Sequence, residues 1–492
     1  MSKFKKKLES FVASDKDYPI IFAIAAGLYS FIYVFASNFV LVNSWFQFFI
    51  ILAAYILIPI VVFKVSWELV QRIKFLNKLQ QVALPVLNAV FFGFYFAGRV
   101  YSFQQRKILL AVVIVCALLA IVLRKQYKKI IVIQFIMAFV AFITLVPTLY
   151  SALFDDDSWR SYPEEVTQTK FTQFPNIYVI QPDGYANFRE LAKDPYNFDN
   201  TEFESYLKNS GFKLYTDFRS NYTSTILSNS SMFAMKHHYK GRQLFGAREV
   251  IMGDNPVIKT LKNNQYETFL FMENPYLLLN RPAIQYDYCN YSMDEVPWFG
   301  LGAFAKRKEL IQPLAETIQK QKGKRSFYLV EKILPGHITT FKKASQGKET
   351  ERENYLTQVK KANEWLKEIT ATIIKNDPNS LIIIAADHGG YVGFEYTREL
   401  FQKQTDPKLV YSAFSAALAI KFPKGQAIAN YDVQLKSPVN LFRTLFAYLG
   451  ENEALLEHMQ EDTSYSRIGN DFFGSTFKYI DADGNVVFEE VE

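Results

Sequence analysis

The chain has 492 residues, of which 50% are hydrophobic and 16% aromatic, and it contains 55 Lys and Arg, 48 Asp and Glu and two Cys. A chain this long and apolar is neither a disordered tail nor a small disulfide scaffold, and it exceeds a single compact domain. Its net charge of +7 is unevenly divided, because residues 1–151 carry 16 basic against 4 acidic side chains and the remaining residues 39 against 44. The first third therefore has a net charge of +12 and the rest a net charge of −5.

The first third contains five long apolar stretches, at residues 19–42, 45–65, 82–98, 108–123 and 130–151. Each is close to the roughly 17–25 residues that cross a bilayer core, and short basic connectors separate them. This pattern argues against buried helices of a soluble domain, and the first stretch is too long for a signal peptide and lacks a small-residue cleavage site. We therefore predict a five-span transmembrane domain at residues 1–151.

The basic residues of this region are concentrated in alternate connections. The leader contains five Lys, the second connector contains three cations and the fourth contains four, whereas the first connector has none and the third has three. Because basic loops stay in the cytoplasm, the N-terminus of this multi-pass protein is predicted to be cytoplasmic. Five spans then place the domain that follows on the outer side of the cytoplasmic (inner) membrane.

After the fifth stretch, residues 152–173 are polar and acidic without apolar periodicity, and we interpret them as a linker. From residue 174 onward, strand-like runs alternate with helical patterns. The expected strands are 176–181, 267–272, 326–334 and 380–386, and the expected helices are 201–209, 351–375 and 438–449. This alternation predicts an α/β domain at residues 174–492 with a mostly parallel sheet flanked by helices. A further hairpin is predicted at residues 477–489, around Asp483-Gly484.

Three of the expected strands end in residues that bind metals. Asp183 follows the first strand, His337 follows the third, and Asp387 and His388 follow the fourth. An Asp-Gly pair such as Asp183-Gly184 usually makes only a turn. However, ligand sites of α/β sheets lie beyond the carboxyl ends of the strands, and two of the five histidines of the chain fall there. We therefore predict a divalent metal site at this edge of the sheet.

Residues 220–235 contain a cluster of hydroxyl groups that runs into a segment with helical apolar spacing. The spacing places Thr225 at the N-terminus of this helix as its cap. A hydroxyl at that position lies beside unpaired backbone N–H groups, which also suit a phosphate oxygen. Taken alone, the hydroxyl cluster is better explained by ordinary capping, and Thr223 and Ser224 offer the same chemistry two residues or fewer away.

The five spans, the acidic linker and three motifs resemble the alkaline phosphatase superfamily. The motifs are Asn-Ile-Tyr-Val-Ile-Gln-Pro-Asp-Gly-Tyr, Thr-Ser-Thr-Ile-Leu-Ser-Asn-Ser-Ser-Met-Phe and Ala-Ala-Asp-His-Gly-Gly. Within that superfamily, the chain looks like the membrane-anchored lipoteichoic acid synthase and phosphoethanolamine transferase group, which has sulfatase-like relatives. The resemblance implies that residues 174–492 form an extracytoplasmic catalytic domain of the alkaline phosphatase/sulfatase type.

The resemblance also implies roles for individual residues. Asp183, Thr225, Asp387 and His388 would bind one divalent metal ion, zinc or manganese, with magnesium as a further option. Thr225 would be the nucleophile and form a phospho-threonine intermediate, and His337 would bind the substrate phosphate or protonate the leaving group. Phosphoryl transfer mainly requires charge neutralisation and alignment, so few residues suffice.

The chain departs from its relatives in three respects. After His388 it offers only His458, so a single metal is expected rather than two. Cys116 and Cys289 do not lie in the Cys/Ser-x-Pro-x-Arg context of sulfatases, which disfavours sulfate-ester hydrolysis. Many phosphoethanolamine transferases have several disulfides in the outward domain, whereas Cys289 alone forms none there, which weakens that substrate assignment.

We expect a bacterial membrane enzyme that moves a phosphate-linked head group, phosphoglycerol or phosphoethanolamine, from a phospholipid donor to an envelope glycan or lipid. A phosphatase or phosphodiesterase with the same site is the first alternative. A non-catalytic membrane scaffold that retains the fold is the second, and the scarcity of histidines is its main support. Nucleic-acid binding is disfavoured because the outward domain is acidic and separated from the cytoplasm.

Overall fold

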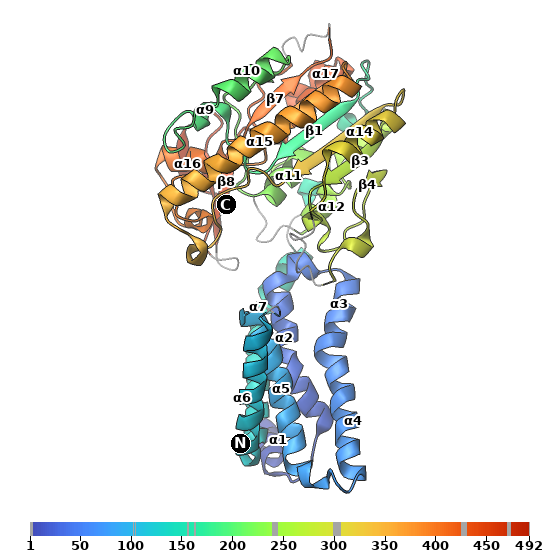
Figure 1. The fold of residues 1–492 in the computed structure, drawn as a ribbon, viewed down its shortest axis with the longest axis vertical. Helices are drawn as coiled ribbons and strands as arrows, with labels where there is room; N and C mark the ends of the chain where they lie inside the picture. Colours follow the sequence, from blue (N-terminus) through green and yellow to red (C-terminus); the bar gives the residue numbers. More distant parts are fainter. Residues whose placement is uncertain are drawn as a thin grey trace. The chain divides into compact units, whose positions relative to one another are not determined.

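Figure 1 shows a computed structural model of the chain. It describes residues 3–101, 103, 105–154, 157–161, 164–238, 245–298, 307–424, 431–469 and 474–491. The chain divides into two compact units, Met1–Leu153 and Phe154–Glu492, which we call the first and second units.

The first unit is built from helices, and its strongly apolar segments follow the expected order. The helices are α1 Lys3–Ala13, α2 Pro19–Val42, α3 Trp45–Leu52, the π-helix η1 Ala53–Leu57, α4 Ile58–Arg72, α5 Gln80–Tyr101, α6 Arg106–Val122 and α7 Tyr127–Phe154. In the described part of the chain, four segments are long and apolar enough to cross a membrane, namely Pro19–Val42, Trp45–Arg72, Asn77–Tyr101 and Arg124–Phe154. The remaining predicted span, the fourth at residues 108–123, corresponds to α6, which has 17 residues and is shorter than these four. The four long helices are thus found where spans were predicted, and a fifth span at α6 stays a prediction.

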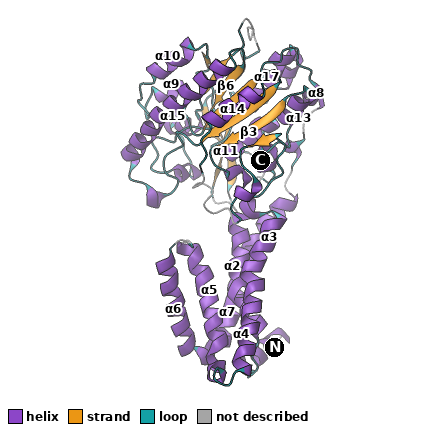
Figure 2. Cartoon of the chain, turned by 45° about the vertical axis from the view of Figure 1, so that its right-hand side comes forward, coloured by secondary structure: helices purple, strands orange, loops and turns teal. Residues whose placement is uncertain are grey.

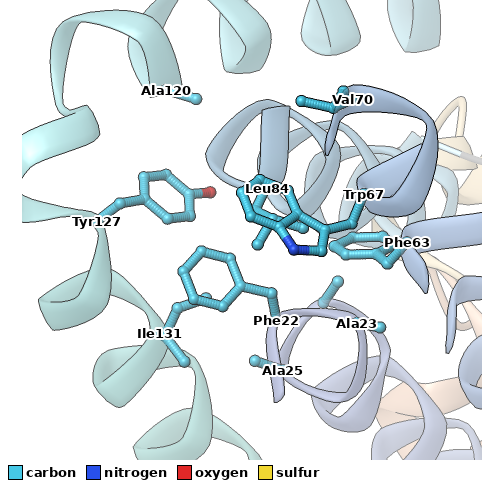
Figure 3. Packing of buried hydrophobic residues seen from close by; sticks show 11 residues of the cluster. Phe22, Ala23, Ala25, Phe63, Trp67, Val70, Leu84, Ala120, Tyr127 and Ile131 are labelled. Atoms are coloured by element: carbon cyan, nitrogen blue, oxygen red, sulfur yellow. The ribbon is translucent and has the colours of Figure 1, made fainter. Parts of the chain in front are cut away.

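The core of the first unit is formed by aromatic and aliphatic side chains from several helices (Figure 3). Phe22 on α2, Phe63 and Trp67 on α4 and Ile131 on α7 pack together, and small residues such as Ala23 allow the helices to approach closely. Large apolar side chains also cover the outside, including Leu118, Val122, Phe139 and Leu153. Helices that are hydrophobic all round are typical of a lipid environment.

The second unit contains a seven-stranded sheet in the order β2-β7-β6-β1-β5-β3-β4 (Figure 2). The strands are β1 Ile177–Pro182, β2 Lys213–Leu214, β3 Glu267–Met272, β4 Tyr288–Cys289, β5 Ser326–Lys332, β6 Leu381–Ala385 and β7 Leu418–Lys421. β1 pairs in parallel with β5 and β6, and β3 pairs in parallel with β5 and β4, whereas β7 runs antiparallel to both of its neighbours. The mostly parallel sheet is confirmed.

Helices cover the sheet in two groups. The longer helices of this unit are α10 Thr201–Asn209, α11 Thr225–Ala234, α13 Pro256–Asn263, α14 Ile311–Lys320, α15 Lys348–Asn376, α16 Pro407–Phe414 and α17 Leu441–Gly450. α15 contacts α14 and accepts a hydrogen bond from α10, while α11 contacts α13 and α17. Every residue of the central strands β1 and β6 is buried, as expected for parallel strands with both faces covered.

A second, three-stranded antiparallel sheet lies near the C-terminus, in the order β10-β9-β8. Its strands are β8 Ser464–Ile468, β9 Ser475–Ile480 and β10 Val486–Glu490. β9 and β10 form the hairpin that was predicted around Asp483-Gly484. β8 was not anticipated, and it contributes residues to the cavity described below.

Much of the segment interpreted as a linker packs into the second unit. α7 continues to Phe154, and α8 spans Glu164–Gln168. The side chains of Trp159, Val166 and Phe171 are buried, and the Phe171 backbone N–H donates to Asn264 Oδ1 over 2.8 Å. The apolar residues that anchor this segment are too few and too widely spaced to produce a periodic pattern.

Candidate active site

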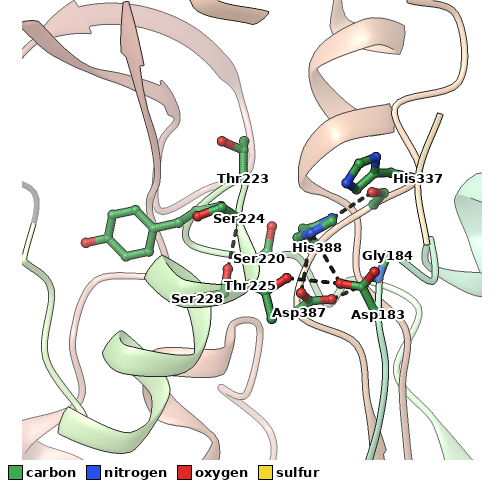
Figure 4. Close-up of polar contacts among 12 residues, drawn as sticks. Asp183, Gly184, Ser220, Thr223, Ser224, Thr225, Ser228, His337, Asp387 and His388 are labelled. Carbon is green, nitrogen blue, oxygen red and sulfur yellow. Dashed lines mark hydrogen bonds and ion pairs between the residues drawn. The ribbon is translucent and has the colours of Figure 1, made fainter. Parts of the chain in front are cut away.

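The predicted metal ligands follow three neighbouring strands of the large sheet. β5, β1 and β6 are adjacent and parallel, so their carboxyl ends lie at one edge. Asp183 follows β1, Asp387 and His388 follow β6, and His337 lies in the loop after β5. Figure 4 shows these side chains converging beside the N-terminus of α11. The structure thus brings together residues that are up to 205 positions apart in sequence.

The turn after β1 requires a glycine at position 184. Gly184 has a φ of +67°, and a Cβ there would lie 2.1 Å from the Gly336 carbonyl oxygen. Gly336 N in turn donates to the Asp183 carbonyl over 2.8 Å, and Asp183 N donates to the Lys332 carbonyl over 2.9 Å. Any side chain at position 184 would push these two loops apart. The close packing of the turns fixes where the Asp183 carboxylate points.

Asp183, Asp387 and His388 form a buried cluster whose ligand atoms all lie within 4.8 Å of one another. His388 Nε2 lies 3.3 Å from Asp387 Oδ2 and 3.8 Å from Asp183 Oδ1. His388 Nδ1 lies 2.9 Å from the Gly389 carbonyl, which only accepts, so Nδ1 carries the proton. The Nε2 lone pair of the neutral ring is therefore available on the carboxylate side, as in histidines that bind metals.

The residues present fit a divalent cation. Asp387 Oδ1 accepts a hydrogen bond from Gly184 N over 2.9 Å, but Asp387 Oδ2 is buried without a hydrogen-bond partner in the described part of the chain. Leaving a carboxylate oxygen buried and unpaired beside a second carboxylate is costly unless a cation compensates. Two carboxylates and one imidazole nitrogen are a common donor set for zinc and manganese.

The pKa values of the cluster reflect the same shortage of positive charge. Burial, together with the neighbouring Asp387 carboxylate, raises the pKa of Asp183. Burial lowers the pKa of His388, but the Asp387 and Asp183 carboxylates outweigh it and raise that pKa above its ordinary value. Both shifts show that the cluster favours added positive charge, in the form of a proton or a cation.

Thr225 is the hydroxyl residue that contacts this cluster. Its Oγ1 donates a hydrogen bond to Asp183 Oδ1 over 3.0 Å, and it is the first residue of α11. The expectation that Thr225 caps the helix was wrong. The cap is Ser224, whose backbone is extended and whose Oγ accepts from Leu227 N over 3.4 Å. Thr225 is thereby left free to direct its hydroxyl toward the acids.

His337 is exposed and lies at the rim of the cluster. Its ring centroid is 5.9 Å from that of His388, and its Nδ1 lies 2.5 Å from the Ile338 carbonyl. Because the carbonyl only accepts, Nδ1 donates, and Nε2 is available to a ligand. The structure therefore places His337 near the four predicted ligands but not among them.

A cavity of about 430 Å³ opens next to Thr225, His337 and His388. Other lining residues come from the 3₁₀ helix η9, Thr397–Phe401, and from β8 and β9. They include Arg398 and Arg467 together with several hydroxyl groups. None of the described lining residues is Asp or Glu. Sequence reasoning missed both arginines, because they lie in a short helix and an accessory strand that no motif marks.

The mostly parallel sheet carries an Asp/His cluster at its carboxyl edge, and a hydroxyl at a helix N-terminus contacts this cluster. This arrangement defines an α/β enzyme of the alkaline phosphatase type. A family model described as "Sulfatase" matches residues 178–451, more than half of the chain, and the chain therefore belongs to the sulfatase family. This match confirms the predicted sulfatase-like domain. No curated protein matches the chain.

Several solved structures are similar to the chain at low identity. The phosphoethanolamine transferase EptA from Neisseria meningitidis has 12% identity and a TM-score of 0.40, with 87% of this chain and 95% of EptA covered. The lipoteichoic acid synthase LtaP from Listeria monocytogenes has 16% identity and a TM-score of 0.39, with 67% and 91% covered. A zinc complex of the periplasmic domain of EcEptC from Escherichia coli has 12% identity and a TM-score of 0.41, with 63% and 93% covered.

Proposed function

We propose that the chain is a membrane-anchored transferase of the bacterial cytoplasmic membrane. It would move a phosphate-linked head group from a phospholipid donor to a glycan or lipid acceptor of the envelope, with its catalytic domain on the outer side. The observation that carries this proposal is the hydrogen bond from Thr225 Oγ1 to Asp183 Oδ1, 3.0 Å long, beside a cluster that fits a cation. A hydroxyl held in this way at a helix N-terminus is suited to attack a phosphate.

In the first step, Thr225 Oγ1 forms a bond to the donor phosphorus, and its proton passes to the Asp183 carboxylate. The bond between phosphorus and the diacylglycerol oxygen breaks, and that oxygen takes up a proton from the imidazolium form of His337. In the second step, an acceptor hydroxyl attacks the phospho-threonine and gives its proton to His337, the bond from Thr225 to phosphorus breaks, and Thr225 regains its proton from Asp183. Asp183 aligns the Thr225 hydroxyl, receives its proton in the first step and returns that proton in the second.

Asp183, Asp387, His388 and the Thr225 hydroxyl would hold the metal ion. When bound, a divalent ion supplies Lewis acidity toward the phosphate oxygens and lowers the pKa of a neighbouring hydroxyl. An imidazole in the donor set favours zinc or manganese over magnesium. The Gly389 carbonyl fixes the orientation of the His388 ring, and Gly184 N fixes that of Asp387.

The cavity supplies further cations for an anionic substrate. Residues 152–492 have a net charge of −5, so a phosphate needs local positive charge at the site. Arg398 and Arg467 line the cavity, and His337 Nε2 is available as a hydrogen-bonding partner of the phosphate or of the leaving oxygen. These three residues would bind and orient the substrate.

The lining favours phosphoglycerol over phosphoethanolamine as the head group. An ammonium group seeks a carboxylate, and the described lining residues include none, whereas two guanidinium groups repel it. Hydroxyl groups of Thr340, Thr397 and Ser466 also line the cavity and suit a polyol. A neutral glycerol group therefore fits this lining better than a cationic one.

The proposal is tested by transfer from phosphatidylglycerol to a glycolipid acceptor, with purified full-length protein and added manganese or zinc. We expect Thr225→Val to lower the transfer rate on the order of 10³-fold or more, because the nucleophile is lost. Thr225→Ser should retain part of the activity, and the control Thr223→Val should stay within a few-fold of wild type. Full activity in Thr225→Val would overturn the proposal.

Two further arms of the same assay define the reaction. Phosphatidylethanolamine in place of phosphatidylglycerol should be transferred more slowly. Release of the free head group at the same rate with and without the glycolipid would identify a hydrolase instead of a transferase.

A further inference from the structure

The first unit contains a guanidinium group, that of Arg99, which has no acidic partner among the described residues. Arg99 lies in the last turn of α5, two residues before its final residue Tyr101. Its Cζ lies 3.4 Å from the centroid of the Tyr33 ring on α2. Its Nη1 atom is buried and has no hydrogen-bond partner among the described residues. Arg99 is half-buried, and an unpaired guanidinium nitrogen of this kind is costly within a membrane unless an anion compensates it.

The first unit offers no carboxylate at this end of its helices. Its four acidic residues are Glu9, Asp15, Asp17 and Glu68. The first three precede α2, and Glu68 lies in the last turns of α4, so all four belong to the connections predicted to be cytoplasmic. Arg99 lies at the opposite end of the bundle, near the C-terminus of α5. The compensating anion must therefore come from outside these residues.

The surroundings of Arg99 are built by two specific features of the neighbouring helices. Gly27 on α2 allows the π-helix η1 to approach, since a Cβ at Gly27 would lie 1.7 Å from the Tyr55 carbonyl oxygen. The wide turn of η1 leaves the Ala54 carbonyl to accept from the Tyr95 hydroxyl over 2.7 Å. The Tyr55 and Tyr95 rings then pack with centroids 4.6 Å apart.

These contacts bring several tyrosines around the guanidinium group. Tyr29 and Tyr55 lie close enough to Arg99 to interact with it electrostatically, in addition to the stacked Tyr33 ring. Tyrosines and a cation at the end of a membrane helix are typical of the depth at which lipid head groups lie. Exposed apolar side chains next to Arg99, including Phe96 and Val100, offer a surface for acyl chains.

We propose that Arg99 binds the phosphate group of a membrane phospholipid, with a preference for lipids of net negative charge. The guanidinium group matches the geometry of two phosphate oxygens, and the tyrosine hydroxyls are further donors. An anionic lipid such as phosphatidylglycerol neutralises Arg99, whereas the ammonium group of phosphatidylethanolamine finds no carboxylate at this end of the unit. This inference rests on the proposed membrane insertion of the first unit but requires no catalytic activity.

The site is tested by native mass spectrometry of the full-length protein in detergent, titrated with dioleoyl phosphatidylglycerol. We expect one lipid per chain to be retained most tightly, and Arg99→Gln to weaken its binding about tenfold, as for the loss of a charge-assisted hydrogen bond worth roughly 1.4 kcal/mol. Arg99→Lys should keep part of the affinity. The control Arg106→Gln removes an exposed cation at the start of α6 and should leave the affinity unchanged.

Two competition arms identify the source of the phosphate. Inorganic phosphate should not displace the bound lipid at equal concentration, and dioleoyl phosphatidylethanolamine should bind more weakly than phosphatidylglycerol. Unchanged lipid binding in Arg99→Gln, or equal displacement by inorganic phosphate, would overturn the proposal. A protein that binds the lipid in this way but shows no head-group transfer would refute the proposed function alone.

Discussion

The two carboxylate oxygens of Asp387 have different surroundings. Oδ1 accepts a hydrogen bond from Gly184 N, whereas Oδ2 is buried without such a partner in the described part of the chain. Together, Oδ2, His388 Nε2 and the Asp183 carboxylate form a set of ligand atoms that could hold one metal ion. A bound metal ion would therefore pair with a carboxylate oxygen that has no hydrogen-bond partner among the described residues.

Metal binding should stabilise the second unit. At a free zinc concentration 100 times the Kd, the wild type should gain about 2.7 kcal/mol in unfolding free energy, and a chelator should remove the gain. Asp387→Asn removes one ligand charge and should abolish most of this effect in a thermal unfolding experiment. Asp217→Asn changes an exposed carboxylate that does not belong to the cluster, and this control should behave as wild type. The same zinc-induced shift in Asp387→Asn would contradict the assignment of the metal ligands.

His238 makes the stability of the second unit depend on pH. It is 5% exposed, its Nε2 lies 2.9 Å from the Leu227 carbonyl, and burial lowers its pKa to about 3. The unfolded chain binds a proton near pH 6.5, whereas the folded state does not until far lower pH. The unfolding free energy should therefore fall as the pH decreases from about 6.5 toward 3.

This contribution is separated from others by comparing two histidine variants. Between pH 7 and pH 4.5, in the presence of a chelator, His238→Asn should lose less stability than the wild type, by on the order of 2 kcal/mol. The exposed His458 serves as the control, and His458→Asn should keep the pH dependence of the wild type. Equal pH dependence in all three proteins would show that His238 is not buried in the neutral form.

At the scale of helices and strands, periodic and continuous apolar runs were predicted well. α10 and β3 begin and end at the predicted residues, and β1, β5 and β6 differ by two residues or fewer. β2, β4 and β7 were missed because they have two to four residues, too few for a recognisable pattern, and β7 also runs antiparallel. Strands of this length depend on pairing with a neighbour more than on their own sequence.

The helix α6 decides on which side of the membrane the second unit lies. With five spans, the second unit is on the side opposite to the N-terminus, and with the four longer helices alone, it is on the same side. The 17 residues of α6 are at the lower end of the roughly 17–25 that cross a bilayer. The basic residues at both of its ends are consistent with a span that reaches both interfaces.

Cysteine labelling tests this topology. In a background in which Cys116 and Cys289 are replaced by Ser, a membrane-impermeant maleimide should label Asp217→Cys in intact spheroplasts. It should label Lys78→Cys, in the connector between α4 and α5, only after permeabilisation. Protection of both positions before permeabilisation would show that α6 does not span the membrane.

At the scale of the whole molecule, the chain combines a basic first unit with an acidic second unit. The +12 of residues 1–151 is the charge distribution expected for the predicted membrane topology, and the −5 of the remainder belongs to the part that carries the candidate site. A phosphate substrate must therefore be attracted by local cations rather than by the overall charge. Arg398, Arg467 and a bound metal would supply them.

The cluster of Asp183, Asp387 and His388 was predictable from sequence because its residues follow recognisable strands. Asp183, Asp387 and His388 each stand directly after a buried apolar run, and parallel pairing brings such positions together. Arg398, Arg467 and Arg99 could not be predicted, because their positions depend on tertiary packing. Sequence reasoning chose Thr225 through the family resemblance and kept Thr223 and Ser224 as alternatives, and in the structure Thr225 is the one that donates to Asp183.

The central claim is that Thr225 carries the head group during transfer. The most direct test is mass spectrometry of the tryptic peptide 220–236 after the metal-loaded protein has been incubated with phosphatidylglycerol without acceptor and quenched in acid. The account predicts a phosphoglycerol adduct that fragmentation places on Thr225, present in Thr223→Val and absent in Thr225→Val. Head-group transfer that proceeds without this adduct, or with the adduct on Thr223 or Ser224, would contradict the account.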